Sequence, residues 1–179
     1  MNISFKKLFG HFKTITAHRH CVIAHSKKAG ILFQGLFHDL SKYSPREFFV
    51  GAKYYSGDKS PNEAERREIG YSTAWMHHKG RNRHHFEYWS DYDMNTHIMV
   101  PMPMPPKYIA EMFCDRVAAS KIYQGEKYTN KHPLEYFLKE KSTLPIHPDT
   151  AEILEELLWA LAENGEDAAF RKVRIMIKK

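Results

Sequence analysis

The chain has 179 residues, enough for one domain with a substantial hydrophobic core. Its 27 Lys and Arg residues against 21 Asp and Glu residues give a net charge of +6, which favours small anionic ligands and argues against nucleic acid as a partner. No apolar run approaches the roughly 18 residues that a membrane-spanning helix needs, so we expect no membrane partner.

The first half of the chain carries four helix patterns. Residues 11–28 repeat apolar side chains at helical spacing, and Gly30 is expected to end or bend that helix. The second helix is expected over residues 31–41, the third from Ser44-Pro45 to Gly57, and the fourth from Ser60-Pro61-Asn62 to about Lys79. Each of the last two begins with a Ser-Pro pair, which is typical of a capped helix start.

The second half is also helical after an irregular stretch from Gly80 to Lys107, where prolines interrupt the sequence VPMPMPP. Helices are expected from Pro105-Pro106 to Gly125, from His132-Pro133, from Pro148-Asp149, and over the basic residues 166–179. No alternating pattern predicts a strand. We therefore predict an all-α bundle: a single domain over residues 1–179, with a metal-binding core at about 11–125 and C-terminal helices at 133–179 packing on it.

Cysteine usage and the N-terminal sequence predict a cytoplasmic location. Cys21 and Cys114 have no metal-type spacing and are expected to be free thiols in a reducing compartment. The first ten residues, MNISFKKLFG, are amphipathic and lack the apolar core of a signal peptide. The oligomeric state is left open, and a homo-oligomer is compatible with the sequence.

The pair His38-Asp39, in GLFHDLSK, is the most informative feature of the chain. On a continuous helix Asp39 follows Leu32 by seven residues and Leu36 by three, so its side chain is expected to point into the core. A buried carboxylate beside a buried imidazole costs several kcal/mol unless something pairs with them. A divalent metal takes both as ligands, and the pair therefore predicts a metal site.

Histidine is the compositional anomaly, with 12 residues in the chain. Candidate further ligands come from four other segments, and they are His18, His78, His84 or His85, and Asp115. Imidazole and carboxylate together suit divalent transition metals such as Fe, Mn, Zn, Co or Ni, and this set is large enough for one or two ions bridged by one Asp. His25 shares the helical face of His18 and is its rival, and helix phase alone does not separate His77 from His78.

Four polar residues near these ligands are candidates for contact with an anionic substrate. Lys42 follows Asp39 by three residues and is expected to lie on the ligand side of a continuing helix turn, where it could act with Asp39 in catalysis. The expected substrate-binding residues are Lys42, Arg81, Asn82 and His85. The alternative is that the charged ones are ordinary solvated side chains.

These motifs resemble the HD-domain superfamily of helical metal-dependent phosphohydrolases and oxygenases. The order of the superfamily's motif is a His, a His-Asp pair, a Lys and a distant Asp, which implies His18, His38-Asp39, Lys42 and Asp115 here. In detail the chain is similar to a small bacterial and phage family with GLxHDLSKxSxxEF, AWxxHxxxNxHHxxYW and EMxxD motifs. It carries GLFHDLSKYSPREF, AWMHHKGRNRHHFEYW and EMFCD. This resemblance favours His78 over His77 and implies a dinuclear site. One departure is Ser41, where the superfamily usually has Gly.

The leading functional hypothesis is hydrolysis of a small phosphomonoester or phosphodiester, including nucleotides, by a metal-activated water. The alternative that the resemblance also implies is a di-iron oxygenase that cleaves a C–C or C–P bond with O₂. A third hypothesis is a helical protein in which the metal only stabilises the fold.

Overall fold

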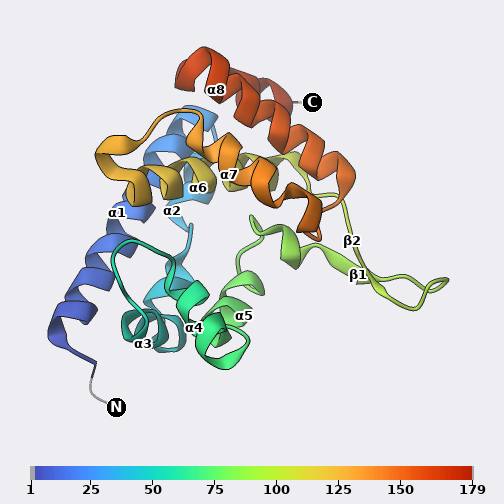
Figure 1. Ribbon diagram of the computed structural model, residues 1–179. Helices are drawn as coiled ribbons and strands as arrows, with labels where there is room; N and C mark the ends of the chain where they lie inside the picture. The colour runs from blue at the N-terminus through green and yellow to red at the C-terminus, as the bar shows by residue number, and fades with distance from the viewer. Residues whose placement is uncertain (1–2, 179) are drawn as a thin grey trace.

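The computed structural model describes residues 3–178, and helices predominate in it, as the sequence predicts (Figure 1). The α-helices are α1 (Phe5–Ala29), α2 (Leu32–Leu36), α3 (Pro45–Lys53), α4 (Pro61–Ile69), α5 (Thr73–Lys79), α6 (Pro106–Gln124), α7 (His132–Glu140) and α8 (Pro148–Ile177). The 3₁₀ turns are η1 (Leu40–Tyr43), η2 (Phe86–Tyr88), η3 (Gly125–Lys127) and η4 (Lys141–Thr143), and the strands are β1 (Ser90–Tyr92) and β2 (Met99–Pro101). None of the described helices is long and apolar enough to cross a membrane.

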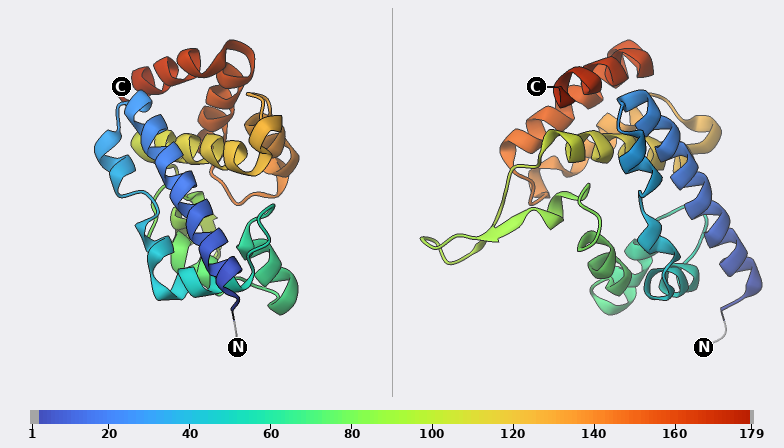
Figure 2. Two further views of the ribbon diagram at one scale, coloured as in Figure 1. Left: turned by 90° about the vertical axis from the view of Figure 1, so that its left-hand side faces the viewer. Right: turned by 180° about the vertical axis from the view of Figure 1, so that it is seen from behind.

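Helix α1 runs along the molecule and contacts α2 and α3 as well as α6 and α8 (Figure 2). It begins earlier than predicted because the Ser4 side chain caps it by accepting a hydrogen bond from the Lys7 backbone N–H. Its buried residues repeat at spacings of three and four, which places imidazoles on the same stripe as apolar side chains. The main members of that stripe are His11, Ile15, His18, Val22, His25 and Ala29.

The hydrophobic core lies where α6 and α8 pack against the C-terminal half of α1 and α7 packs on α6 and α8. Val22, Phe113, Phe137, Leu154 and Phe170 are among its side chains that are almost fully removed from solvent. The predicted C-terminal helices are present, and α8 continues through a non-helical residue, Gly165. This core holds α1 and α6 in place, and both helices carry side chains of the candidate site.

The predicted helix over residues 31–41 is wrong. Helix α2 ends at Leu36, and Asp39 adopts a left-handed backbone with φ of 54° before the η1 turn. Gly35 faces α1 so closely that a Cβ there would lie 2.4 Å from the Ser26 side chain. Because the glycine face of α2 packs inward, Leu32 and Leu36 point outward and are 40% and 43% exposed.

The predicted helix from Ser60 to Lys79 is divided in two. Gly70 ends α4 with a left-handed φ of 85°, and Ser72 caps α5 by accepting a hydrogen bond from the Trp75 N–H at 3.0 Å. The buried Glu65 carboxylate accepts hydrogen bonds from the Ser72 hydroxyl at 2.6 Å and the Thr73 N–H at 3.0 Å. A carboxylate on the first amides of α5 stabilises this break.

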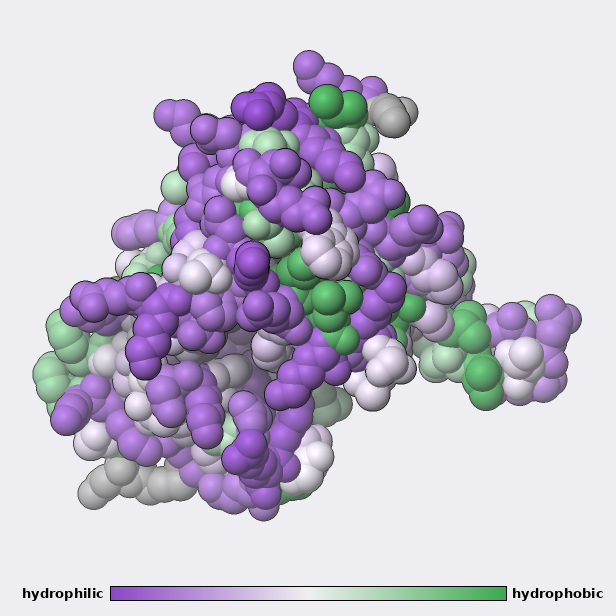
Figure 3. Space-filling model, turned by 45° about the horizontal axis from the view of Figure 1, so that its top comes forward, coloured by the Kyte–Doolittle hydropathy of each residue, from purple (hydrophilic) through white to green (hydrophobic). Residues whose placement is uncertain are grey.

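A two-stranded hairpin occupies part of the stretch predicted to be irregular, so the prediction of no strand was wrong. Strands β1 and β2 pair antiparallel, with Asp91 opposite Val100, and the hairpin projects from the body (Figures 1 and 2). Hydrophobic side chains gather on this projection (Figure 3), among them Met94 and Met99. Three-residue strands are too short to show the alternation by which strands are recognised.

Candidate metal centre

The structure brings all six predicted metal ligands together around the buried carboxylate of Asp39. They come from α1, the α2–η1 turn, α5, the loop after α5, and α6, and they are His18, His38, Asp39, His78, His84 and Asp115. They form two groups that share Asp39, and in each group the ligand atoms lie within 4.8 Å of one another. His85 joins the second group, so both members of the pair His84-His85 reach the centre.

The left-handed backbone of Asp39 explains how two neighbouring residues both face one centre. On a regular helix adjacent side chains diverge by roughly 100°. At Asp39 the chain reverses instead, and the side chains of His38 and Asp39 are 0% and 2% exposed. Asp is one of the few non-glycine residues that adopts this conformation at modest energetic cost.

One oxygen of the Asp39 carboxylate, Oδ2, faces the first group. It lies 3.2 Å from Nε2 of His38 and 3.8 Å from Nε2 of His18. Asp115, on α6, completes the group, with its Oδ1 2.9 Å from His18 Nε2 and 3.4 Å from His38 Nε2. Two imidazoles and two carboxylates therefore point at one place.

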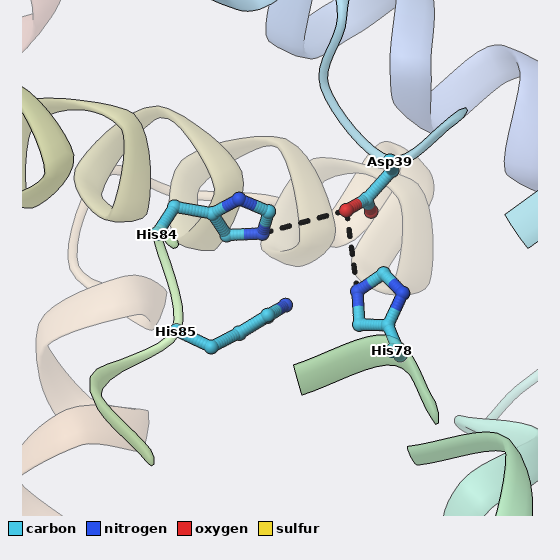
Figure 4. A group of neighbouring side chains, drawn as sticks. All are labelled: Asp39, His78, His84 and His85. Atoms are coloured by element: carbon cyan, nitrogen blue, oxygen red, sulfur yellow. Dashed lines mark ion pairs between the residues drawn. The ribbon is translucent and has the colours of Figure 1, made fainter. Parts of the chain in front are cut away.

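The other oxygen, Oδ1, faces the second group (Figure 4). It lies 3.2 Å from Nε2 of His78 and 3.4 Å from Nε2 of His84. His85 lies beside both, with its ring centroid 4.8 Å from that of His78 and 4.0 Å from that of His84. Asp39 thus lies between two sets of imidazoles and offers one oxygen to each.

The donor set fits divalent metal ions. Among the described residues, the buried side-chain atoms without a hydrogen bond of good geometry include both oxygens of Asp39 and the Nε2 atoms of five histidines: His18, His38, His78, His84 and His85. Leaving one such atom unsatisfied typically costs about 1–3 kcal/mol. Two ligands at about 2.1 Å from one ion lie roughly 3 Å apart, and the separations of 2.9–3.8 Å around Asp39 are close to this value.

Two further carboxylates hold the ligands from outside. Glu111 Oε1 lies 2.9 Å from Nδ1 of His38 and 3.2 Å from Nδ1 of His84, so a single oxygen supports one histidine of each group. Glu47 Oε2 lies 2.8 Å from Nδ1 of His78. Because a carboxylate only accepts hydrogen bonds, it places the hydrogen on Nδ1 and leaves Nε2 to bind a metal.

Burial and neighbouring charges shift the pKa values of several groups in the centre. Burial alone would raise the pKa of Asp39, but His38 and Lys42 hold it well below its usual range. Burial would likewise raise the pKa of Glu111, and hydrogen bonds with His38 and His84 lower it to about 2. Burial lowers the pKa of His85 well below 6.5, with a further contribution from His84. Ionised carboxylates beside a neutral imidazole are a suitable environment for a cation.

Lys42 lies at the edge of the centre and lines a cleft that reaches it. Its Nζ is 2.6 Å from Asp39 Oδ2, and its side chain is 30% exposed. The same cleft is also lined by the candidate ligand His78 and by Tyr55, Asn62 and Tyr123. A molecule entering this cleft would meet the Lys42 ammonium group beside the shared carboxylate.

The other predicted residues lie farther from the ligand atoms. Arg81 is exposed and donates to the His77 carbonyl, away from the centre. Asn82 donates to the Ser41 hydroxyl at 2.9 Å and to the His78 carbonyl at 2.8 Å, which braces the ligand loop. The His77 imidazole lies 2.6 Å from the outer carboxylate of Glu47, and the buried His25 lies against the Cys114 carbonyl.

The sequence interpretation missed Glu47 and Glu111. Glu47 lies in the first turn of α3, and Glu111 lies four residues before Asp115 on the same face of α6. The repeated carboxylates E and D of EMFCD are the signal that could have indicated Glu111.

A family model described as "Family of unknown function (DUF5662)" matches residues 7–160. No curated protein and no solved structure matches the chain.

Proposed function

The chain belongs to the DUF5662 family of unknown function, and we propose that it is a metal-dependent phosphohydrolase built on an HD-like helical bundle. The observation that carries the proposal is the shared carboxylate of Asp39. Its two oxygens face separate imidazole sets, and a lysine ammonium group lies beside it at the end of a cleft.

His18, His38, Asp39 and Asp115 would hold one metal, and Asp39 with His78, His84 and His85 would hold the other. Bound there, two divalent cations would lower the pKa of a water molecule and neutralise charge on a phosphoryl group. Glu47 and Glu111 fix the ring orientations from outside, which keeps the ligand atoms in position.

Lys42 gives the site its preference for an anion. Its ammonium group forms an ion pair with a buried carboxylate on one side and faces the cleft on the other, so it can contact a phosphate oxygen as negative charge grows there. The cleft wall adds hydroxyl and amide groups from Tyr55, Asn62 and Tyr123, which suit a polar organic group. We propose a small phosphorylated molecule as the substrate. A cytoplasmic location agrees with the free thiols Cys21 and Cys114.

The proposal is tested by metal analysis of protein purified without added metal, followed by phosphate release from a panel of phosphomonoesters and phosphodiesters. Asp39→Asn is the matched inactive variant, because asparagine also adopts the left-handed backbone while it removes the charge. We expect the parent to hold metal and release phosphate, and the variant to do neither. Failure on every phosphoester, together with O₂ uptake by an iron-loaded form, would instead support an oxygenase.

A further inference from the structure

A basic face rich in exposed phenylalanine covers α1, α2 and α3, and the proposed metal chemistry does not use it. The chain has 11 phenylalanines, and every one that is exposed in the described residues lies within residues 5–49. They are Phe5, Phe9, Phe12, Phe33, Phe37 and Phe49, with exposed fractions from 46% to 81%. Exposed aromatic side chains concentrated in this way mark a surface that binds something.

The helices that carry them, α1, α2 and α3, lie next to one another on one side of the molecule (Figure 2, left). Phe5, Phe9 and Phe12 follow one another at helical spacing on α1. Phe12 packs edge-on against Tyr43 and Phe48, next to the exposed Phe49. Arg19, two turns further along α1, donates to the Leu36 carbonyl of α2, the helix region where the exposed rings of Phe33 and Phe37 contact each other edge-on.

The charge of this face is strongly one-sided. Residues 1–57 contain nine of the 27 Lys and Arg residues but only two of the 21 acidic residues. Those two, Asp39 and Glu47, are buried in the metal centre with exposed fractions of 2% and 4%. Lys28 and Lys53 pair with Glu166 and Glu68 from other elements, whereas the described part of this segment presents cations such as Lys6 and Lys13 and no exposed carboxylate of its own.

We propose that this basic phenylalanine face docks on the surface of an anionic phospholipid bilayer. Phenylalanine flanked by lysine on an amphipathic helix is the pattern of segments that lie in the membrane interface. Anionic headgroups would meet the cations while the exposed rings enter the acyl boundary. A second copy of the chain fits less well, because a two-fold interface would place this cationic face against itself. The expectation of no membrane partner was based on the absence of a spanning segment, and surface docking does not need one.

Flotation of the full-length protein with vesicles tests the proposal. We expect binding to vesicles of phosphatidylcholine with phosphatidylglycerol, little binding to phosphatidylcholine alone, and weakening at high salt. The double variant Phe5→Ser/Phe9→Ser should reduce binding at least about tenfold. These two rings stack on each other at the exposed end of α1, so the fold should survive, which circular dichroism checks. The matched control is Met94→Ser/Met99→Ser, two exposed apolar residues on the hairpin.

The charge contribution is tested separately with Lys6→Glu/Lys13→Glu, for which a loss of at least about tenfold is expected. Its control is Lys127→Glu/Lys139→Glu, which changes exposed lysines outside the face and should leave binding unchanged. The proposal is overturned by absence of binding to the anionic vesicles, or by binding that the phenylalanine variant does not alter. A dimer in sedimentation velocity that Phe5→Ser/Phe9→Ser converts to a monomer would identify a second copy as the occupant.

Discussion

Nζ of Lys42 lies 2.6 Å from Oδ2 of Asp39, the carboxylate oxygen that also faces His18 and His38. The two residues differ sharply in exposure, since the lysine side chain is 30% exposed and the aspartate side chain 2%. The left-handed turn at Asp39 and the η1 turn after it create this pair. The chain therefore places a cation between a buried carboxylate and the cleft.

Replacing Lys42 by Met should lower phosphate release on the order of 100-fold, because one charge that stabilises the transition state is lost. Metal content should not fall, since lysine is not a ligand and its removal frees Oδ2 of Asp39 from a competing cation. Turnover and metal content are measured on the same preparation. The control is Lys59→Met, which removes an exposed cation from the outer part of the same cleft. Unchanged turnover in Lys42→Met would remove the proposed role.

Replacing His78 by Ala should reduce the metal content from two ions per chain to about one, because Nε2 of His78 faces the second group only. His77→Ala is the matched control. The imidazole of His77 pairs with Glu47 and belongs to neither group of candidate ligands around Asp39. Elemental analysis with protein quantitation gives the stoichiometry. A parent protein that never holds more than one ion would rule out a dinuclear centre.

The two outer carboxylates should have different effects on metal affinity. Glu111 supports His38 of the first group and His84 of the second, whereas Glu47 supports only His78 among the ligands. Glu111→Gln should therefore weaken both metal positions, and Glu47→Gln only one, each by roughly 10–100-fold. Competition with a metal-binding dye measures the two affinities. Equal effects of the two variants on both positions would contradict the separate roles.

The stability of the fold should decrease in mild acid because of His25. Burial lowers its pKa to about 4, and Lys121 contributes in the same direction. The unfolded chain, with a histidine pKa of about 6.5, then binds the proton more readily, so stability is complete above that pH and is lost as the pH falls toward 4. Between pH 7 and pH 5 this single group should reduce the free energy of unfolding by about 2 kcal/mol.

Urea unfolding at pH 7 and pH 5 checks this prediction. His25→Gln should reduce the total difference by about the 2 kcal/mol that this group contributes, whereas His20→Gln, a change at an exposed histidine on the same helix, should retain it. If His25→Gln and the parent show the same loss between the two pH values, the buried imidazole is not responsible.

Most helices could be predicted from the sequence because their signals are local. Helical periodicity with a proline at the start or a glycine at the end indicated α1, α3, α6 and α8, although the start of α1 was placed too late. The breaks were missed at Asp39, which follows a tertiary contact, and at Gly70, whose left-handed backbone ends α4. In the first case Gly35 packs on Ser26, and in the second Glu65 caps the start of α5.

The sequence predicted the candidate metal ligands around Asp39 but not the carboxylates Glu47 and Glu111 that hold them from outside. Asp39 was correctly expected to be buried, but the reason was wrong, because Leu32 and Leu36 face solvent and the chain reversal turns the carboxylate inward. Glu111 meets His38 across 73 residues of chain, a distance that no local pattern encodes. Choosing between His84 and His85 was unnecessary, since both reach the centre.

The position of Asp39 between two groups has a consequence for the connectivity of the whole chain. His18, Asp39, His78 and Asp115 divide the sequence into long loops, and cations held between them would close those loops at one point. Such closure restricts the unfolded ensemble in the way that a disulfide does, and more so for longer loops. Both cysteines of this chain are free, so no disulfide provides such a cross-link. Bound metal ions would take that role. A chelator would then destabilise the fold in the way that a reductant destabilises a disulfide-bonded protein.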